Sequence, residues 1–197
     1  LKANFDVTEL KKYIDEKNKK LEDGKITLFH AFVTATAKTI YNRPLLNNFV
    51  TAKRYYSRNE IIISFVAKDK MSDSGEERLI MLKVKDDMNL ESISSKIFKD
   101  VKKTRKLGTN DIDDSLKFIT KFPRGITNLI VKGFKWLDYH GWVPRDMCDG
   151  DPNYSTVMLS NLGSIKSGSC YHHLNNYGTN SIVGTIGVIH PEYTIDK

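Results

Sequence analysis

The chain contains 197 residues, of which 40% are hydrophobic and 28% are charged, with only 12 glycines and 5 prolines. This composition is typical of a globular protein and excludes the disordered, collagen-like and low-complexity classes. The 31 lysines and arginines exceed the 24 acidic residues by seven, so the surface attracts anions, which include nucleic acid, acidic lipid and phosphorylated cofactors.

The first half of the chain predicts two helices followed by extended segments. Residues 6–9 carry a capping pattern that starts the first helix, and residues 27–41 predict the second. Residues 47–56 predict an extended segment. The apolar, β-branched run 60–67 predicts a buried central strand, and residues 78–84 predict its antiparallel partner.

The next part of the chain predicts further helices and a loop. Residues 89–106 predict a helix because apolar residues recur at four-residue spacing, and Gly108 is placed to end it. Residues 111–139 predict two helices that break near Pro123, since the residue before a proline disfavours the helical region. Residues 141–155 contain prolines and a glycine and predict a loop.

Two strands complete the prediction, over residues 155–159 and 181–189. Helices and strands are mixed without a strict βαβ alternation, so the predicted fold class is α+β. The sequence has no internal repeat and no long linker, and we therefore expect one domain over residues 1–197.

Two segments have patterns that allow more than one role. Residues 96–106 form a basic helix that would either grip phosphates or present a solvated face. The second role is favoured, and nucleic acid is not expected as a partner, because no nucleic-acid fold signature accompanies the helix. Residues 123–142 place apolar side chains on one helical face, which favours core or a subunit interface over an anionic membrane surface. These side chains are Ile126, Leu129, Ile130, Phe134 and Leu137.

The short motifs for phosphate and metal binding are incomplete in this chain. Residues 163–169 are rich in glycine and serine but lack P-loop spacing, which favours a turn. Asp146, Asp149 and Asp151 lack the glycine and glutamate of a calcium-binding EF-hand, so we interpret them as turn formers. No metal is therefore expected.

The cysteines and the apolar runs bear on the compartment. Cys148 and Cys170 allow at most one disulfide, and free thiols in a reducing compartment are favoured. No apolar run approaches the roughly 18 residues of a membrane span, and the N-terminus has no signal pattern. These features favour a cytoplasmic protein without a membrane span.

The richest polar stretch is Ser160–Gly163 followed by Cys170–Gly178, which contains His172 and His173. Histidine titrates near neutrality and serves as general base, metal ligand or pH switch. Adjacent residues of an extended segment face opposite ways, so at most one histidine of the pair is expected to do chemistry. Cys170 lacks a local activating group for a Cys-His pair, and residue types alone favour structural histidines.

Five segments, in order along the chain, carry a family resemblance. Together they resemble the catalytic domain of the 2-oxoacid dehydrogenase acyltransferases, which shares its fold with chloramphenicol acetyltransferase. The ordered set carries the resemblance, since each segment alone is only moderately specific. The segments are Ile26–Val33, Arg43–Asn47, Ile61–Phe65, Tyr154–Gly163 and Thr179–Gly187.

The resemblance implies a two-layer sandwich with a mixed β-sheet covered by helices, assembled as a homotrimer that can join a 2-oxoacid dehydrogenase complex. It implies transfer of an acyl group between coenzyme A, supplied as acetyl-CoA, and a thiol or hydroxyl acceptor such as a dihydrolipoyl group, without metal. Ser160 occupies the position of the serine that stabilises the oxyanion, with Ser155 and Ser164 as nearby alternatives. The channel residues implied are Asn161, Gly163 and His172.

The chain departs from the family in its general base. The family uses a histidine in an H-x-x-x-D-G motif, and none of the five histidines here is followed by that pattern. His173 begins a similar stretch with Tyr177 in place of the aspartate. This stretch precedes the last strand, whereas the family motif follows it, so we interpret it as a chance match and keep His173 only as a fallback for the general base. We expect that the chain as given stops before the motif; the alternative is a non-catalytic trimeric assembly or interaction module of the same fold.

Overall fold

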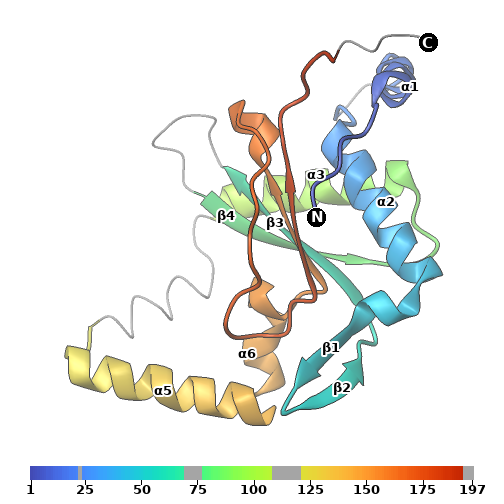
Figure 1. Cartoon of the computed structure of the whole chain (residues 1–197). Helices are drawn as coiled ribbons and strands as arrows, with labels where there is room; N and C mark the ends of the chain where they lie inside the picture. Colours follow the sequence, from blue (N-terminus) through green and yellow to red (C-terminus); the bar gives the residue numbers. More distant parts are fainter. Residues whose placement is uncertain (22–23, 69–76, 108–120, 193–197) are drawn as a thin grey trace.

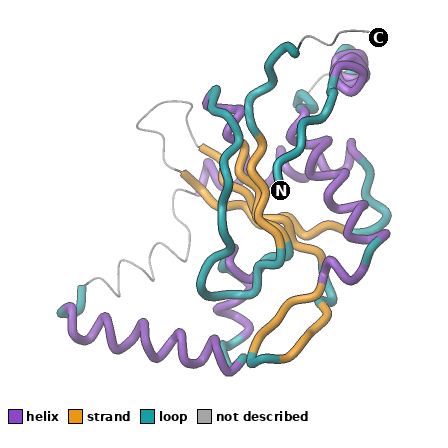
Figure 2. Tube along the Cα trace, viewed as in Figure 1, coloured by secondary structure: helices purple, strands orange, loops and turns teal. Residues whose placement is uncertain are grey.

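A computed structural model of the protein describes residues 1–21, 24–68, 77–107 and 121–192. Two layers are evident, with a mixed sheet on one side and the helices α2 and α3 packed on it (Figures 1 and 2). The helical elements are α1 (Thr8–Asn18), α2 (Leu28–Asn42), η1 (Pro44–Asn47), α3 (Leu90–Leu107), α5 (Arg124–His140), α6 (Arg145–Asp149), η2 (Pro152–Tyr154) and η3 (Leu162–Ile165). The strands are β1 (Asn48–Thr51), β2 (Arg54–Ser57), β3 (Ile61–Lys68), β4 (Glu77–Val84), β5 (Val157–Asn161) and β6 (Ile182–Ile186).

The main sheet has four strands in the order β4-β3-β5-β6, and its pairing is both antiparallel and parallel. β3 pairs antiparallel with β4, with Ile63 opposite Leu82, and parallel with β5, with Ile63 opposite Val157. β5 pairs parallel with β6, with Val157 opposite Ile182. The α+β class and the mixed sheet expected from the sequence are confirmed.

The hydrophobic core lies between this sheet and the two helices. Alternate residues of each strand point into it, because successive side chains of a strand face opposite sides of the sheet. The helical spacing of α2 and α3 supplies the opposing surface. The buried residues of this core are Val33, Ala37, Ile40, Ile61, Ile63, Phe65, Ile80, Leu82, Val84, Ile93, Ile97, Val157 and Leu159.

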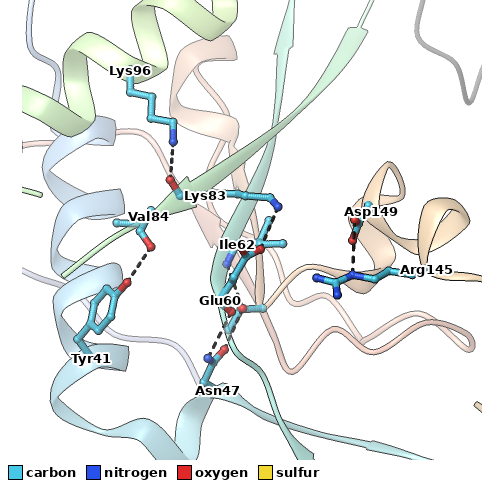
Figure 3. Close-up of polar contacts among 10 residues, drawn as sticks. Tyr41, Asn47, Glu60, Ile62, Lys83, Val84, Lys96, Arg145 and Asp149 are labelled. Atoms are coloured by element: carbon cyan, nitrogen blue, oxygen red, sulfur yellow. Dashed lines mark hydrogen bonds and ion pairs between the residues drawn. The ribbon is translucent and has the colours of Figure 1, made fainter. Parts of the chain in front are cut away.

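Polar contacts at the rim of the core tie both helices to β4 (Figure 3). The Tyr41 hydroxyl of α2 donates to the Val84 carbonyl at 2.7 Å, and Lys96 Nζ of α3 donates to the Lys83 carbonyl at 2.7 Å. Lys83 Nζ also forms an ion pair with Glu60 at 2.9 Å. The contacts from Tyr41 and Lys96 satisfy backbone carbonyls of β4 from the helical layer.

Several predicted boundaries need correction. Residues 47–56 are not one extended segment but the hairpin of β1 and β2, turned by Ala52 and Lys53 at φ of 50° and 62°. Positive φ at both central residues matches the twist of a two-residue hairpin, and the sequence hides this turn because neither residue is glycine. The predicted loop 141–155 contains the short helices α6 and η2.

The structure also bears on the two segments with alternative roles, residues 96–106 and 123–142. The side chains of α3 are described as far as Lys103, and Lys99, Lys102 and Lys103 are exposed, as a solvated face requires. The apolar face of α5 is not core of this chain, since no residue of that helix is buried. Gly108 and the first of the two helices predicted over 111–139 lie largely outside the described residues.

Candidate functional site

Ser160 lies near the end of β5, one of the two central strands of the sheet. Its neighbour Leu159 is 2% exposed in the core, so the alternation of the strand turns Ser160 to the opposite face of the sheet. Thr185 of β6 is its partner across the parallel ladder. Paired strands place partner side chains on one face, so two hydroxyl groups stand side by side there.

The turn that follows Ser160 is held by its own backbone. The carbonyl of Asn161 accepts the Ser164 hydroxyl at 2.7 Å, and Ser167 N–H donates to the Leu162 carbonyl at 3.0 Å. Gly163 packs so closely on the chain after β6 that an added Cβ would meet the Gly187 carbonyl oxygen at 2.8 Å. A glycine is therefore required for the turn to approach β6.

The loop between β5 and β6 returns along the same edge (Figure 2). Val188 N–H donates to the Ser167 carbonyl at 2.9 Å, and the Thr185 hydroxyl donates to the Cys170 carbonyl at 2.6 Å. The chain up to Cys170 is thus fixed beside Thr185 and, through it, beside Ser160.

The three candidate serines differ in what their hydroxyl groups contact. Ser155 is fully buried, and its hydroxyl donates to the Pro152 carbonyl at 2.7 Å and lies 2.8 Å from the Ser64 hydroxyl. Ser164 is exposed, with its hydroxyl on the Asn161 carbonyl. The hydroxyl of Ser160, which is half-buried, has no hydrogen-bond partner within the described ranges. Of the three, Ser160 keeps a donor for a ligand.

The two histidines lie on the exposed part of the β5–β6 loop. Nδ1 of His172 lies 2.6 Å from the His173 carbonyl, and Nδ1 of His173 lies 2.6 Å from the Leu174 carbonyl. Because a carbonyl only accepts, each Nδ1 is the donor in its contact. Among the described residues, no hydrogen bond joins either ring to Ser160. The turn therefore places Asn161 and Gly163 next to Ser160, whereas no hydrogen bond among the described residues links the histidines to it.

A polar network that the sequence did not indicate anchors the far end of this loop. The Asp138 carboxylate of α5 accepts the Tyr154 hydroxyl at 2.6 Å and Gly178 N–H at 3.1 Å. Asn153 N–H and side chain both donate to Asp151, and its side-chain amide also donates to the Tyr177 hydroxyl at 2.7 Å. Burial and the Asp138 contact raise the pKa of Tyr154, so its hydroxyl stays protonated as the donor.

Arg58 joins the hairpin to this network. Its Nη1 donates to the Tyr154 carbonyl at 2.8 Å, and its Nη2 donates to the Thr179 hydroxyl at 3.0 Å and to the Thr179 carbonyl. The guanidinium stacks on the Phe49 ring at 4.4 Å. Burial lowers its pKa to about 10, so the group remains a cation at neutral pH. An isolated arginine after a short strand gives no sequence signal of this role.

The cysteines and carboxylates show no second reactive centre in the part of the chain that is described. Cys148 and Cys170 are both free, and burial first, then nearby aspartates, raises the pKa of Cys148 to about 11, which disfavours the nucleophilic thiolate. Asp149 pairs with Arg145 at 3.8 Å, and Asp151 caps η2. No group of three metal-binding side chains is found among the described residues.

Within residues 1–21, 24–68, 77–107 and 121–192, no helix is both long enough and apolar enough to cross a bilayer.

Known structures share this fold. A probable dihydrolipoamide acetyltransferase from Listeria monocytogenes 4b F2365 matches with a TM-score of 0.61 and 17% identity, over 97% of this chain and 64% of its own. The cubic core of the pyruvate dehydrogenase multienzyme complex matches with a TM-score of 0.54 and 14% identity. The dihydrolipoamide acetyltransferase of Azotobacter vinelandii matches with a TM-score of 0.54 and 15% identity. Each of these two covers 87% of this chain and 54% of its own length.

These likenesses confirm the suspected resemblance at the level of the fold. The chain spans between 54% and 64% of the length of these three structures. No protein-family model matches the chain. No curated protein matches it in sequence.

Proposed function

We propose that this chain is part of a coenzyme A-dependent acyltransferase and that Ser160 donates the hydrogen bond that stabilises the oxyanion. The observation that carries the proposal is the half-buried Ser160 hydroxyl, which has no hydrogen-bond partner among the described residues, in a fold shared with a dihydrolipoamide acetyltransferase. The excess of seven positive charges supports an anionic ligand such as coenzyme A.

The chemistry requires one donor and one base. A base takes the proton of the acceptor thiol or hydroxyl, whose sulfur or oxygen then bonds to the acyl carbonyl carbon. The carbonyl oxygen becomes negative, and a donor placed about 2.7–3.1 Å from it stabilises this charge. The carbon–sulfur bond to coenzyme A then breaks, and the departing thiolate takes up a proton. Ser160 supplies the donor in this scheme.

We assign the role of general base to none of the described histidines. His173 lies on an exposed loop with Nδ1 on its own neighbour's carbonyl. In addition, its sequence carries Tyr177 where the family motif has an aspartate. Asn161, Gly163 and His172 remain the proposed neighbours of the coenzyme A thiol arm. A homotrimer within a 2-oxoacid dehydrogenase assembly is the proposed context, and a cytoplasmic location fits it.

The test measures acetyl transfer from acetyl-CoA to dihydrolipoamide by the full natural polypeptide, with coenzyme A binding followed by calorimetry. S160A should lower kcat by roughly 10²–10³ with little change in KM, because the donor acts on charge that develops in the transition state. S164A should retain most activity, since its hydroxyl already caps the turn. Loss of activity in S164A with full activity in S160A would reassign the donor.

The rival is a non-catalytic assembly or interaction module, favoured by the absence of H-x-x-x-D-G from the 197 residues. Turnover would exclude the rival. Absence of both turnover and coenzyme A binding, in a protein that sediments as a trimer, would favour it.

A further inference from the structure

Helix α5 has two chemically different faces. At 100° per residue, Ile126, Leu129 and Ile130 fall on one arc of the helix, the apolar arc, and Trp136 lies at its border. The cations of the helix fall outside this arc, and they are Arg124, Lys132 and Lys135. Such a division, with lysine and arginine on the face away from leucine and isoleucine and a tryptophan at the border, is typical of a helix that lies in the plane of a membrane surface.

The apolar arc of α5 is open to solvent in this chain. Leu129 is 71% exposed, Trp136 53% and Ile126 47%, and no residue of the helix is buried. The helix is attached through its C-terminal half, where Phe134 contacts the Tyr177 ring and Asp138 binds Tyr154. Its N-terminal half projects away from the sheet (Figure 1). The position leaves the apolar arc accessible to a large flat surface.

The charge on the helix points to an anionic surface. Arg124, Lys132 and Lys135 form no ion pair with any described residue, nor does Lys121 just before the helix. The one acidic residue of the helix, Asp138, is already engaged by Tyr154 and Gly178. The helix therefore presents uncompensated positive charge, and each cation near an anionic bilayer contributes about 1 kcal/mol of attraction.

The apolar strip of α5 is too small to hold a second copy of the chain by itself. A 17-residue helix is about 25 Å long, and an apolar strip about 10 Å wide offers roughly 250 Å². A stable protein interface needs about 800 Å² from each partner. A bilayer needs no complementary shape, since side chains insert individually between lipids.

We propose that α5 docks the protein on the surface of a bilayer that contains anionic phospholipid. The helix lies in the membrane plane, with Leu129 and its neighbours in the boundary between headgroups and acyl chains. Trp136 and Trp142, 53% and 62% exposed, lie at the same end of the helix and have the amphipathic rings that prefer this boundary. The lysines outside the apolar arc remain in the headgroup field.

The two tryptophans of the chain make the experiment direct, because Trp136 and Trp142 are the only ones present and both lie on or beside α5. Vesicles of 70% phosphatidylcholine and 30% phosphatidylglycerol should shift the tryptophan emission to the blue and carry the protein upward in flotation. Pure phosphatidylcholine vesicles should bind much less, and 0.5 M salt should weaken binding to the mixed vesicles.

Variants separate the two faces of the helix. L129D should weaken vesicle binding at least about ten-fold, because a large apolar side chain is lost from the boundary. K132E/K135E should weaken it at least about 25-fold, at about five-fold for each of the two lost cations. L45D changes an equally exposed leucine on η1, at 83% exposure, and should bind as the parent does.

Three results would overturn the proposal. The first is no blue shift and no flotation with the mixed vesicles. The second is equal weakening by L129D and L45D, which would show that the α5 face is not involved. The third is a blue shift on raising the protein concentration without vesicles, together with a doubled mass in sedimentation, which would assign the face to a second copy.

Discussion

The buried histidine of α2 makes the stability of the fold depend on pH. His30 is 7% exposed, and its Nδ1 accepts the Thr27 backbone N–H at 3.3 Å at the start of the helix. Burial lowers its pKa from 6.5 to about 4. A proton on Nδ1 would remove this acceptor and place a charge in an apolar site.

The sign and the size follow from the two pKa values. The unfolded chain, with a pKa of 6.5, binds the proton more tightly than the folded protein, with a pKa of about 4. Stability is therefore complete above pH 6.5 and is lost as the pH falls towards 4. At about 1.4 kcal/mol per pKa difference of one, the free energy of unfolding should fall by about 2 kcal/mol between pH 7 and pH 5.

The assay is urea unfolding at pH 7, 6 and 5 for the parent and for H30Q. The glutamine oxygen can accept the Thr27 N–H and is favoured at this position of a helix start, but it does not titrate. The parent should lose about 2 kcal/mol more than H30Q over this range. H172Q, which changes an exposed histidine, should keep the parent's slope. Equal slopes for the parent and H30Q would refute the reasoning.

Three further changes test the packing by urea unfolding. G178A should lower the free energy of unfolding by at least about 2 kcal/mol, because φ is 82° and a Cβ would overlap the Asn153 carbonyl. G125A has open space around it in α5 and should raise the free energy of unfolding by up to about 1 kcal/mol. An unchanged free energy of unfolding in G178A would contradict this. R58K should lower the free energy of unfolding by about 2 kcal/mol, since lysine cannot make both the Tyr154 and Thr179 hydrogen bonds and also stack on Phe49. An unchanged urea midpoint would show that these guanidinium contacts are dispensable. L82A should lower the free energy of unfolding by about 3 kcal/mol, because Leu82 is 0% exposed, whereas L45A at an exposed site should change it by almost nothing. Similar losses of stability in both variants would exclude the assigned core.

The turn after β5 illustrates how local and tertiary information combine. The family resemblance indicated Ser160 as the candidate oxyanion donor, with Ser155 and Ser164 as nearby alternatives. The choice among Ser155, Ser160 and Ser164 rests on hydroxyl partners, and those of Ser155 include Ser64, 91 positions away. No local pattern reports such a contact.

The sequence by itself determined the elements whose signal is periodic and strong. The run 60–67 became β3 and residues 27–41 became α2 within one residue at each end, because period-two and period-3.6 apolar patterns impose burial on one strand face or helix stripe. The sequence also carried the family resemblance that the fold confirms.

Only the tertiary structure decided where amphipathic and polar groups find their partners. The sequence pattern of the apolar stripe of α5 is the same whether the helix faces a core, a subunit or a membrane. Its exposure follows from the position of the helix in the fold, beyond the sheet (Figure 1). Arg58 and Asp138 carry no motif, yet they join the hairpin, α5 and the β5–β6 loop. Their roles depend partly on distant groups, since Gly178 is 40 residues from Asp138 and Thr179 is 121 residues from Arg58. Hydrogen bonds form between neighbours in space whatever their separation in sequence.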